Sequence, residues 1–151
     1  MPYVLADTGF WYAAFDGRDS YAAKAVDVVR RLETFQIILP WPILYETLGT
    51  RFVRNEKALR GFNRYLKRPG VNFLDDQKYR QQAFDDSLYW SLEKGRPMSM
   101  VDCAIRLMIQ DRNVKIDYFV TFNPADFADV CQKSGIEMDS GSGDVSERSA
   151  R

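Results

Sequence analysis

Four acidic side chains have the types and spacing expected for metal-assisted chemistry. Asp7 directly follows a short apolar segment, and Asp126 follows a second apolar segment near the end of the chain. Glu46 and Asp102 lie near the starts of two segments whose apolar residues recur at helical spacing. Carboxylate oxygens suit hard ions such as Mg²⁺ and Mn²⁺, which activate water for attack on phosphate esters. The pattern therefore favours a hydrolytic metal site.

Each of these acids also has an ordinary structural explanation. An Asp that follows a strand, as Asp7 does, often forms a turn or caps the next helix. Asp102 and Asp126 each stand three residues after a Ser or Asn, which is the spacing of a capping box. Glu46 fits the solvated surface of a helix. The group is more informative than its members, because several carboxylates in one pocket repel each other unless a cation binds between them.

The elements that must position these acids alternate along the chain. Short strand patterns are predicted at residues 3–7, 36–39, 71–74, 116–121 and 136–138. Longer helical patterns are predicted at residues 9–15, 21–34, 42–48, 51–68, 76–94, 99–108 and 124–134. This alternation predicts an α/β fold with a central parallel β-sheet flanked by helices on both faces. In such a sheet the carboxyl ends of the strands share one edge, where the four acids would meet.

Composition limits both the chemistry and the domain count. The 151 residues fit one domain at 1–139, followed by a polar segment at 140–151 that we expect to be disordered. The sequence contains no histidine, which excludes Ser–His–Asp and Cys–His nucleophilic schemes and the commonest zinc ligand sets. Cys103 and Cys131 have neither metal-motif nor disulfide-framework spacing. Together with the lack of a signal-peptide pattern, they favour a cytoplasmic protein.

Four stretches carry a resemblance to a known family. They are VLADT at 4–8, WPILYE at 41–46, MSMVD at 98–102 and VTFNPADF at 120–127. In this order and at these intervals they resemble the motifs of PIN-domain ribonucleases, and in particular the small VapC-type toxins of toxin–antitoxin pairs. The resemblance covers about residues 2–138 and implies a PIN-like fold. It also implies RNA as the substrate, an antitoxin as a partner and a homodimer.

The resemblance further implies a Mg²⁺- or Mn²⁺-dependent endoribonuclease. Asp7, Asp102 and Asp126 would bind the metal, and Glu46 would complete the coordination sphere or orient the water. An ion held there would lower the pKa of bound water and orient it for in-line attack on phosphorus, without a protein nucleophile. One departure is Asn123, which stands where the family often has an acid. Its carbonyl oxygen adds no charge, so a second ion would bind weakly.

A basic run at 51–68 is the best candidate for contact with phosphates, since it carries seven basic residues against one acid. Such runs are also common on solvated helix faces, and this explanation stays open.

A second departure from the family pattern is Gly9, because the family often has Ser or Asn at this position. The predicted substrate contacts are basic residues of this run and polar residues beside the acids, namely Arg51, Arg54, Arg60, Thr8 and Asn123.

Two other functions remain open. The first is a PIN-like module that binds RNA or a protein without cleaving RNA, and Asn123 is its support in the sequence. The second is a phosphohydrolase of the haloacid dehalogenase type. That resemblance needs a second Asp two residues after Asp7, where this chain has Gly9. The two enzymatic hypotheses both predict that Asp7→Asn abolishes activity while the fold is retained.

Overall fold

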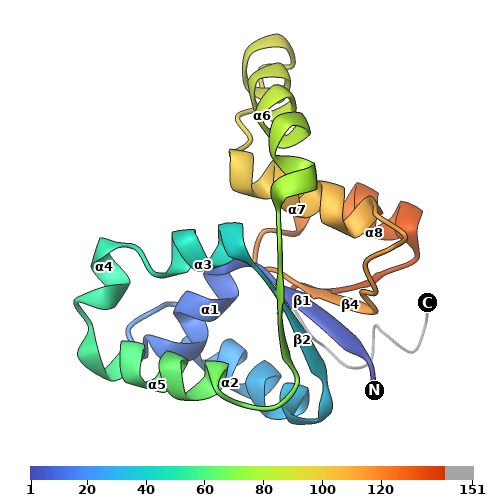
Figure 1. Cartoon of the computed structure of the whole chain (residues 1–151). Helices are drawn as coiled ribbons and strands as arrows, with labels where there is room; N and C mark the ends of the chain where they lie inside the picture. The colour runs from blue at the N-terminus through green and yellow to red at the C-terminus, as the bar shows by residue number, and fades with distance from the viewer. Residues whose placement is uncertain (142–151) are drawn as a thin grey trace.

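Five short strands form one parallel sheet at the centre of the computed structural model, which describes residues 1–141 (Figure 1). The order across the sheet is β3-β2-β1-β4-β5, and every neighbouring pair runs parallel. The strands are β1 (Tyr3–Ala6), β2 (Gln36–Pro40), β3 (Val71–Leu74), β4 (Tyr118–Val120) and β5 (Glu137–Asp139). The α/β fold predicted from the sequence is confirmed.

Helices cover both faces of this sheet. One face carries α1, α2 and α5, and the other carries α7 and α8 (Figure 1). The helices are α1 (Thr8–Phe15), α2 (Ala22–Arg31), α3 (Trp41–Thr47), α4 (Thr50–Val53), α5 (Glu56–Leu66), α6 (Arg80–Leu88), α7 (Met100–Gln110) and α8 (Ala128–Ser134). Short 3₁₀ segments lie at Leu32–Thr34, Gln77–Tyr79 and Pro124–Asp126. No helix within residues 1–141 is both long and apolar enough to cross a membrane.

The central strand explains why the sequence begins with an apolar run. Val4, Leu5 and Ala6 of β1 are 0% exposed, because helices cover both sides of the strand. The chain moves from β1 outward through β2 to β3, then returns to the other side of β1 with β4. The direction of winding therefore reverses between β1 and β4. In open parallel sheets, ligands bind at this point, beside the carboxyl ends of the strands.

An aromatic cluster joins α1 to α5 beneath the sheet. The ring of Trp11 lies 5.8 Å from that of Phe62 and 5.4 Å from that of Tyr65, measured between centroids. Phe15, one turn further along α1, lies 5.4 Å from Phe62. Aromatic pairs at such distances add about 0.5–1.5 kcal/mol each beyond the area they bury. This part of the molecule is therefore held firmly in place.

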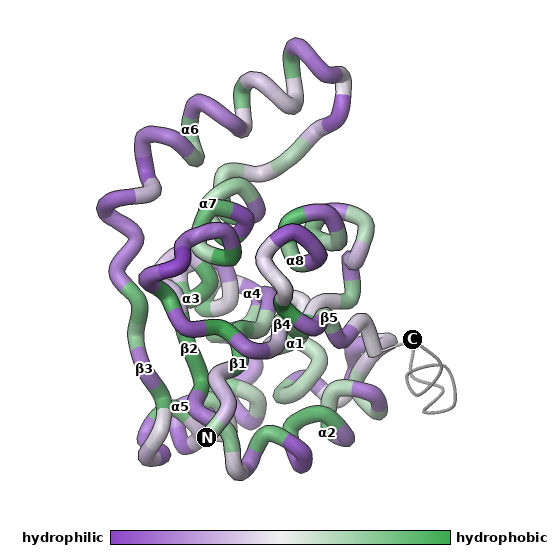
Figure 2. Tube along the Cα trace, turned by 90° about the vertical axis from the view of Figure 1, so that its right-hand side faces the viewer, coloured by the Kyte–Doolittle hydropathy of each residue, from purple (hydrophilic) through white to green (hydrophobic). Residues whose placement is uncertain are grey.

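The helix α6 stands apart from this core. Figures 1 and 2 show α6 projecting from the body, with a mostly hydrophilic trace in Figure 2. A π-helical segment, Tyr89–Glu93, continues it, where the sequence predicted one uninterrupted helix. Its attachment to α7 is a small cluster of four buried side chains, Ala83, Met98, Cys103 and Ala104.

Several predicted boundaries shift in the structure. The strand predicted at 116–121 is shorter, because β4 pairs with β1 only from Tyr118 to Val120. Apolar residues at helical spacing place Val26 on the buried face of the helix predicted at 21–34, but in α2 Val26 is 40% exposed and Val28 is buried instead. The predicted disordered segment begins at 140, and residues 142–151 lie outside the part of the chain that the structure describes.

Candidate active site

Asp7 lies at the reversal point of the sheet, where β1 ends and α1 begins. Its backbone N–H donates to the carbonyl oxygen of Val120 at the end of β4, at 2.9 Å. Its Oδ1 accepts a hydrogen bond from the N–H of Thr8 at 2.7 Å, so the side chain caps α1. Its Oδ2 accepts from the hydroxyl of Thr121 at 3.1 Å. The carboxylate is thus fixed between two neighbouring strands.

Burial raises the pKa of Asp7 above its ordinary value of 3.8. The hydrogen bonds from Thr8 and Thr121 lower this pKa, whereas the charges of Glu46 and Asp126 raise it further. Since burial dominates, the site is a place where negative charge is costly in the absence of a cation.

Asp102 reaches the same region from α7. Ser99 caps this helix, because its Oγ accepts a hydrogen bond from the N–H of Asp102 at 3.1 Å. This confirms the cap predicted at Ser99 and places Asp102 in the first turn. Burial raises the pKa of Asp102 to about 6, and the charges of Asp7, Glu46 and Asp126 add to that rise in this order. Asp7 and Asp102 therefore both sense the charges of Glu46 and Asp126.

Glu46 belongs to α3, which begins directly after β2. Pro42 occupies an early position in this helix, where the missing N–H costs nothing. The backbone carbonyl of Glu46 accepts a hydrogen bond from the hydroxyl of Tyr12 at 2.6 Å, which ties α3 to α1. The side chain of Glu46 is exposed and forms no ion pair within the described residues. It is therefore available to a ligand.

Asp126 differs from the other three acids because it already has a cation. The Nη2 atom of Arg96 lies 2.6 Å from Asp126 Oδ1 and 2.9 Å from the carbonyl oxygen of Ala125. The side-chain amide of Asn123 donates to the other oxygen, Asp126 Oδ2. Both carboxylate oxygens thus have partners. Asn123 makes no helix-capping bond, so the capping box suggested at 123–126 is wrong.

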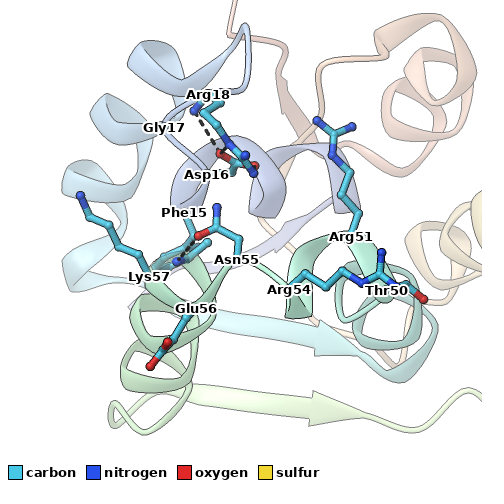
Figure 3. Close-up of a pocket in the computed structure, with 11 residues that line it drawn as sticks. Phe15, Asp16, Gly17, Arg18, Thr50, Arg51, Arg54, Asn55, Glu56 and Lys57 are labelled. Carbon is cyan, nitrogen blue, oxygen red and sulfur yellow. Dashed lines mark hydrogen bonds and ion pairs between the residues drawn. The ribbon is translucent and has the colours of Figure 1, made fainter.

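Besides Asn123, the predicted substrate contacts have three different surroundings. Thr8 is 3% exposed, so its side chain lies inside the protein beside Asp7. Arg60 is bonded to Glu56 at 2.6 Å on the same helix. Arg51 and Arg54 are exposed and line a groove with Arg18 and Lys57 (Figure 3).

Sequence reasoning missed three residues around the acids. Thr121 follows a predicted strand directly, so its place beside Asp7 follows from the parallel pairing of β1 and β4. Tyr12 and Arg96 left no such signal. Their partners, Glu46 and Asp126, lie 34 and 30 positions away in the chain. Contacts of this kind depend on tertiary packing that a local pattern does not encode.

The chemistry of the donor set fits a hard divalent cation. Asp7, Glu46 and Asp102 offer only oxygen ligands, and none of them forms an ion pair within residues 1–141. Among the described residues, however, no three acidic or thiol side chains already sit close enough together to enclose an ion. The arrangement is therefore a set of four acids whose side chains must turn toward an ion to bind it. We give this set, Asp7, Glu46, Asp102 and Asp126, the name acidic crevice.

Comparison with known proteins identifies the fold. No protein-family model matches the sequence, and a search of curated proteins finds no match. Among solved structures, the fold is similar to the crystal structure of VapC20 from Mycobacterium tuberculosis, a toxin that cleaves the sarcin–ricin loop. The TM-score is 0.59 at 18% sequence identity, and the match covers 77% of this chain and 86% of that one. The likeness shows that this chain has the PIN-like fold of that toxin.

Proposed function

We propose that this protein is a metal-dependent endoribonuclease that hydrolyses RNA phosphodiester bonds at the acidic crevice. One observation carries the proposal. At the reversal point of a parallel sheet, Asp7 and Asp102 are partly buried beside each other's charge and those of Glu46 and Asp126, and their pKa values are raised there. Buried acids with raised pKa values gather at functional sites more often than elsewhere. The fold shared with a toxin that cleaves the sarcin–ricin loop adds support.

In this proposal Asp7 and Asp102 hold the ion, and Glu46 completes its shell or orients the water. A bound Mg²⁺ or Mn²⁺ would supply an activated water and neutralise charge that develops on the phosphate. The chain contributes orientation. The backbone N–H of Thr8 and the hydroxyl of Thr121 fix the carboxylate of Asp7 through two hydrogen bonds. Binding an ion therefore removes little further conformational freedom from this side chain.

Asp126 has a more peripheral part in the proposal. We keep it as an additional metal ligand, as the sequence resemblance implies, with Asn123 beside it. To reach an ion its carboxylate must leave Arg96, and the charge-assisted hydrogen bond between them opposes that movement. A second ion on this side would therefore bind more weakly than the first.

We also propose the biological setting that the resemblance implies. The protein would act in the cytoplasm as the toxin of a toxin–antitoxin pair, and it would form a homodimer. Exposed apolar side chains along the projecting helical segment support a protein interface there, because large exposed apolar patches mark interaction sites. They are Phe84, Leu88, Tyr89 and Leu92, with exposed fractions of 47–74%. Sedimentation of the purified protein would test the homodimer.

A second candidate is a PIN-like module that binds RNA without cleaving it. The ion pair between Arg96 and Asp126 favours this candidate, since it neutralises one of the four acids. Asn123 also adds no charge where the family often has an acid. This candidate predicts RNA binding that is unaffected by metal.

Cleavage of end-labelled cellular RNA tests the proposal. We would compare wild type with Asp7→Asn, each in Mn²⁺ and in EDTA. Wild type should cleave only with Mn²⁺, and Asp7→Asn should lose at least about 100-fold in rate, more than the 10–100-fold typical of groups that only support a metal ligand. Asp27→Asn is the matched control, because Asp27 is an exposed acid of α2 outside the crevice.

The outcomes separate the candidates. Equal cleavage by wild type and Asp7→Asn would mean that the site is wrong or that a contaminant cleaves the RNA. Binding of RNA without cleavage by the folded wild-type protein would favour the binding module. Far-UV circular dichroism of Asp7→Asn would show whether the variant keeps its fold.

A further inference from the structure

A charged hollow is formed by residues around the end of α1, α4 and the start of α5. It is an open groove of about 890 Å³ between the loop that follows α1, the short helix α4 and the start of α5 (Figure 3). We call it the basic groove. Its charged lining residues are Asp16, Arg18, Arg51, Arg54, Glu56 and Lys57.

The acids of this groove are already paired, whereas three of its cations are not. Arg18 binds both carboxylate oxygens of Asp16, at 3.0 and 3.1 Å. Glu56 binds Arg60, and Figure 3 shows its side chain pointing away from Arg18 and Asp16. Of the remaining groups, Arg51, Arg54 and Lys57 are exposed and form no ion pair within the described residues. Three uncompensated cations around one hollow attract an anion with several charges.

The backbone around these cations is rigid before any ligand arrives. Asn55 caps α5, since its Oδ1 accepts a hydrogen bond from the N–H of Ala58 at 3.2 Å. The floor residue Phe15 packs against Phe62 and Tyr65 of α5. A Cβ added at Gly61 would come within 3.1 Å of Phe15, which shows how closely α1 and α5 approach. The fold therefore fixes the distances between the Cα positions of the three cationic residues.

A short series of contacts connects the basic groove to Glu46. Arg51 lines both the basic groove and a smaller adjoining hollow of about 200 Å³, whose other walls are Tyr12, Asp16, Asp19 and Phe52. Tyr12 in turn donates its hydroxyl proton to the backbone carbonyl of Glu46. The pKa of Tyr12 is raised by burial and by the charge of Glu46, and the charge of Arg51 opposes this rise. Tyr12 is thus within the electrostatic reach of both sites.

We propose that the basic groove binds the sugar–phosphate backbone of the RNA strand to one side of the bond cut at the acidic crevice. Arg51, Arg54 and Lys57 contact the phosphates, and Asp16 holds Arg18 at the groove wall. The proposal rests on the proposed nuclease function, and it adds the surface that guides the strand. Phe15 is the one aromatic side chain in the lining, and it packs against α5. The groove therefore reads charge and not base identity.

A binding measurement tests the groove independently of cleavage. The groove variant Arg51→Gln/Arg54→Gln/Lys57→Gln is made in an Asp7→Asn background, and the probe is a labelled, unstructured 12-nucleotide RNA in EDTA. Single-stranded binding weakens with salt by a slope of about 0.7 per phosphate contact. The groove variant should therefore flatten the slope of log affinity against log salt by about 2. It should also bind at least about tenfold more weakly at low salt.

A charge-matched control lies elsewhere on the surface. Arg112→Gln/Lys115→Gln/Lys133→Gln removes the same charge around a separate hollow beside α7 and α8. This control variant should keep the wild-type slope. If the control and groove variants lower the slope equally, or if the groove variant binds as wild type does, the proposal is overturned. Groove-dependent binding of a polyglutamate peptide with no binding of RNA would also overturn it, in favour of an acidic protein partner.

Cleavage provides a second readout that separates binding from chemistry. The groove variant in the otherwise wild-type protein should raise KM for the 12-nucleotide RNA and leave kcat unchanged. A dinucleotide, whose one phosphate is the scissile one, should be cleaved equally by wild type and groove variant. If the wild type cleaves no RNA yet binds it through the groove, the nuclease proposal fails and the groove proposal stands. If the wild type cleaves RNA but the groove variant binds and cleaves it as well as the control variant does, the groove proposal fails and the nuclease proposal stands.

Discussion

The acidic crevice and the basic groove handle charge in opposite ways. In the crevice, Asp7 and Asp102 are partly buried, held by hydrogen bonds and close to other acids, so their pKa values rise. In the groove, Arg51, Arg54 and Lys57 extend into solvent from the α4–α5 region. A charge kept from water acts strongly on what binds beside it, whereas an exposed charge is screened by salt.

This difference indicates what each region is suited to do. In the crevice the acids repel one another, and a bound cation would relieve that repulsion. This arrangement suits a reaction at a single bond. The groove offers weak and additive attractions over a longer path, which suits holding a strand. Changes in the crevice should therefore alter stability and reaction rate together, whereas changes in the groove should alter salt-dependent binding alone.

The largest expected effect concerns the contribution of Asp102 to the pH dependence of the free energy of unfolding. Its folded-state pKa of about 6 exceeds the ordinary value of 3.8, so between these values the folded protein binds more protons than the unfolded chain. The free energy of unfolding should therefore fall as pH rises from about 4 to 6 in EDTA. Asp102→Asn removes this contribution, so the variant should gain about 1 kcal/mol over wild type by pH 7, after allowing for screening.

Urea denaturation at a series of pH values measures this effect. Adding Mn²⁺ at pH 7 should stabilise wild type and leave Asp102→Asn nearly unchanged, because the ion needs the charged carboxylate. A constant difference between the two proteins from pH 4 to pH 7 would show that Asp102 is not desolvated in the folded protein.

A smaller effect should follow from removing the one cation paired within the crevice. Arg96→Gln frees the carboxylate of Asp126 and removes a positive charge from its side. Since a partly exposed ion pair contributes about 0.2–1 kcal/mol, Mn²⁺ should bind about two- to fivefold more tightly. Calorimetric titration with Mn²⁺ measures this affinity.

Lys94→Gln is the control for this measurement. Lys94 lies two positions before Arg96 and stacks on the ring of Tyr89, away from Asp126. Equal affinities in Arg96→Gln and wild type would mean that Asp126 takes no part in binding the ion. Such a result would leave Arg96 as a link between the loop after the π-helical segment and the 3₁₀ turn.

The smallest effect concerns a position beside Asp7 that carries no charge. Gly9 lies in the first turn of α1, and a Cβ there would meet nothing within 4 Å. Gly9→Ala should therefore stabilise the protein by about 0.4–1 kcal/mol, because it restricts the unfolded chain. Urea denaturation would detect the gain, and cleavage should be unchanged. A loss of cleavage without a loss of stability would mean that the substrate passes close to this Cβ.

The sequence contained enough to predict the sheet and the position of Asp7 at its carboxyl edge. Asp7 could be placed because β1 is an apolar run with a carboxylate at its end, and parallel strands share one edge. Ser99 could be placed because capping depends on neighbours within one turn. The strand at 71–74 was predicted with its observed bounds, since Pro69 and Gly70 delimit it.

Other features depend on distant packing and were not accessible. The bond between Tyr12 and Glu46 requires α1 and α3 to meet, and the pair of Arg96 and Asp126 requires the loop before α7 to reach the turn after β4. Arg60 was predicted as a phosphate contact from charge alone, yet Glu56 at helical spacing binds it. Val26 of α2 is a further case. Where apolar residues are adjacent in the sequence, their spacing is compatible with either of two neighbouring helix faces being buried, and the sequence alone does not decide between them.

The central place of β1 has a consequence for how the protein is made. β1 is synthesised well before its neighbour β4, because the bond between Asp7 and Thr121 spans 114 positions. At about 5–20 residues per second, β1 waits roughly 6 to 23 seconds for this partner. Until β4 has been synthesised, Asp7 lacks the strand that holds its carboxylate. For a protein proposed to cut RNA, this topology delays activity until β4 has joined the sheet.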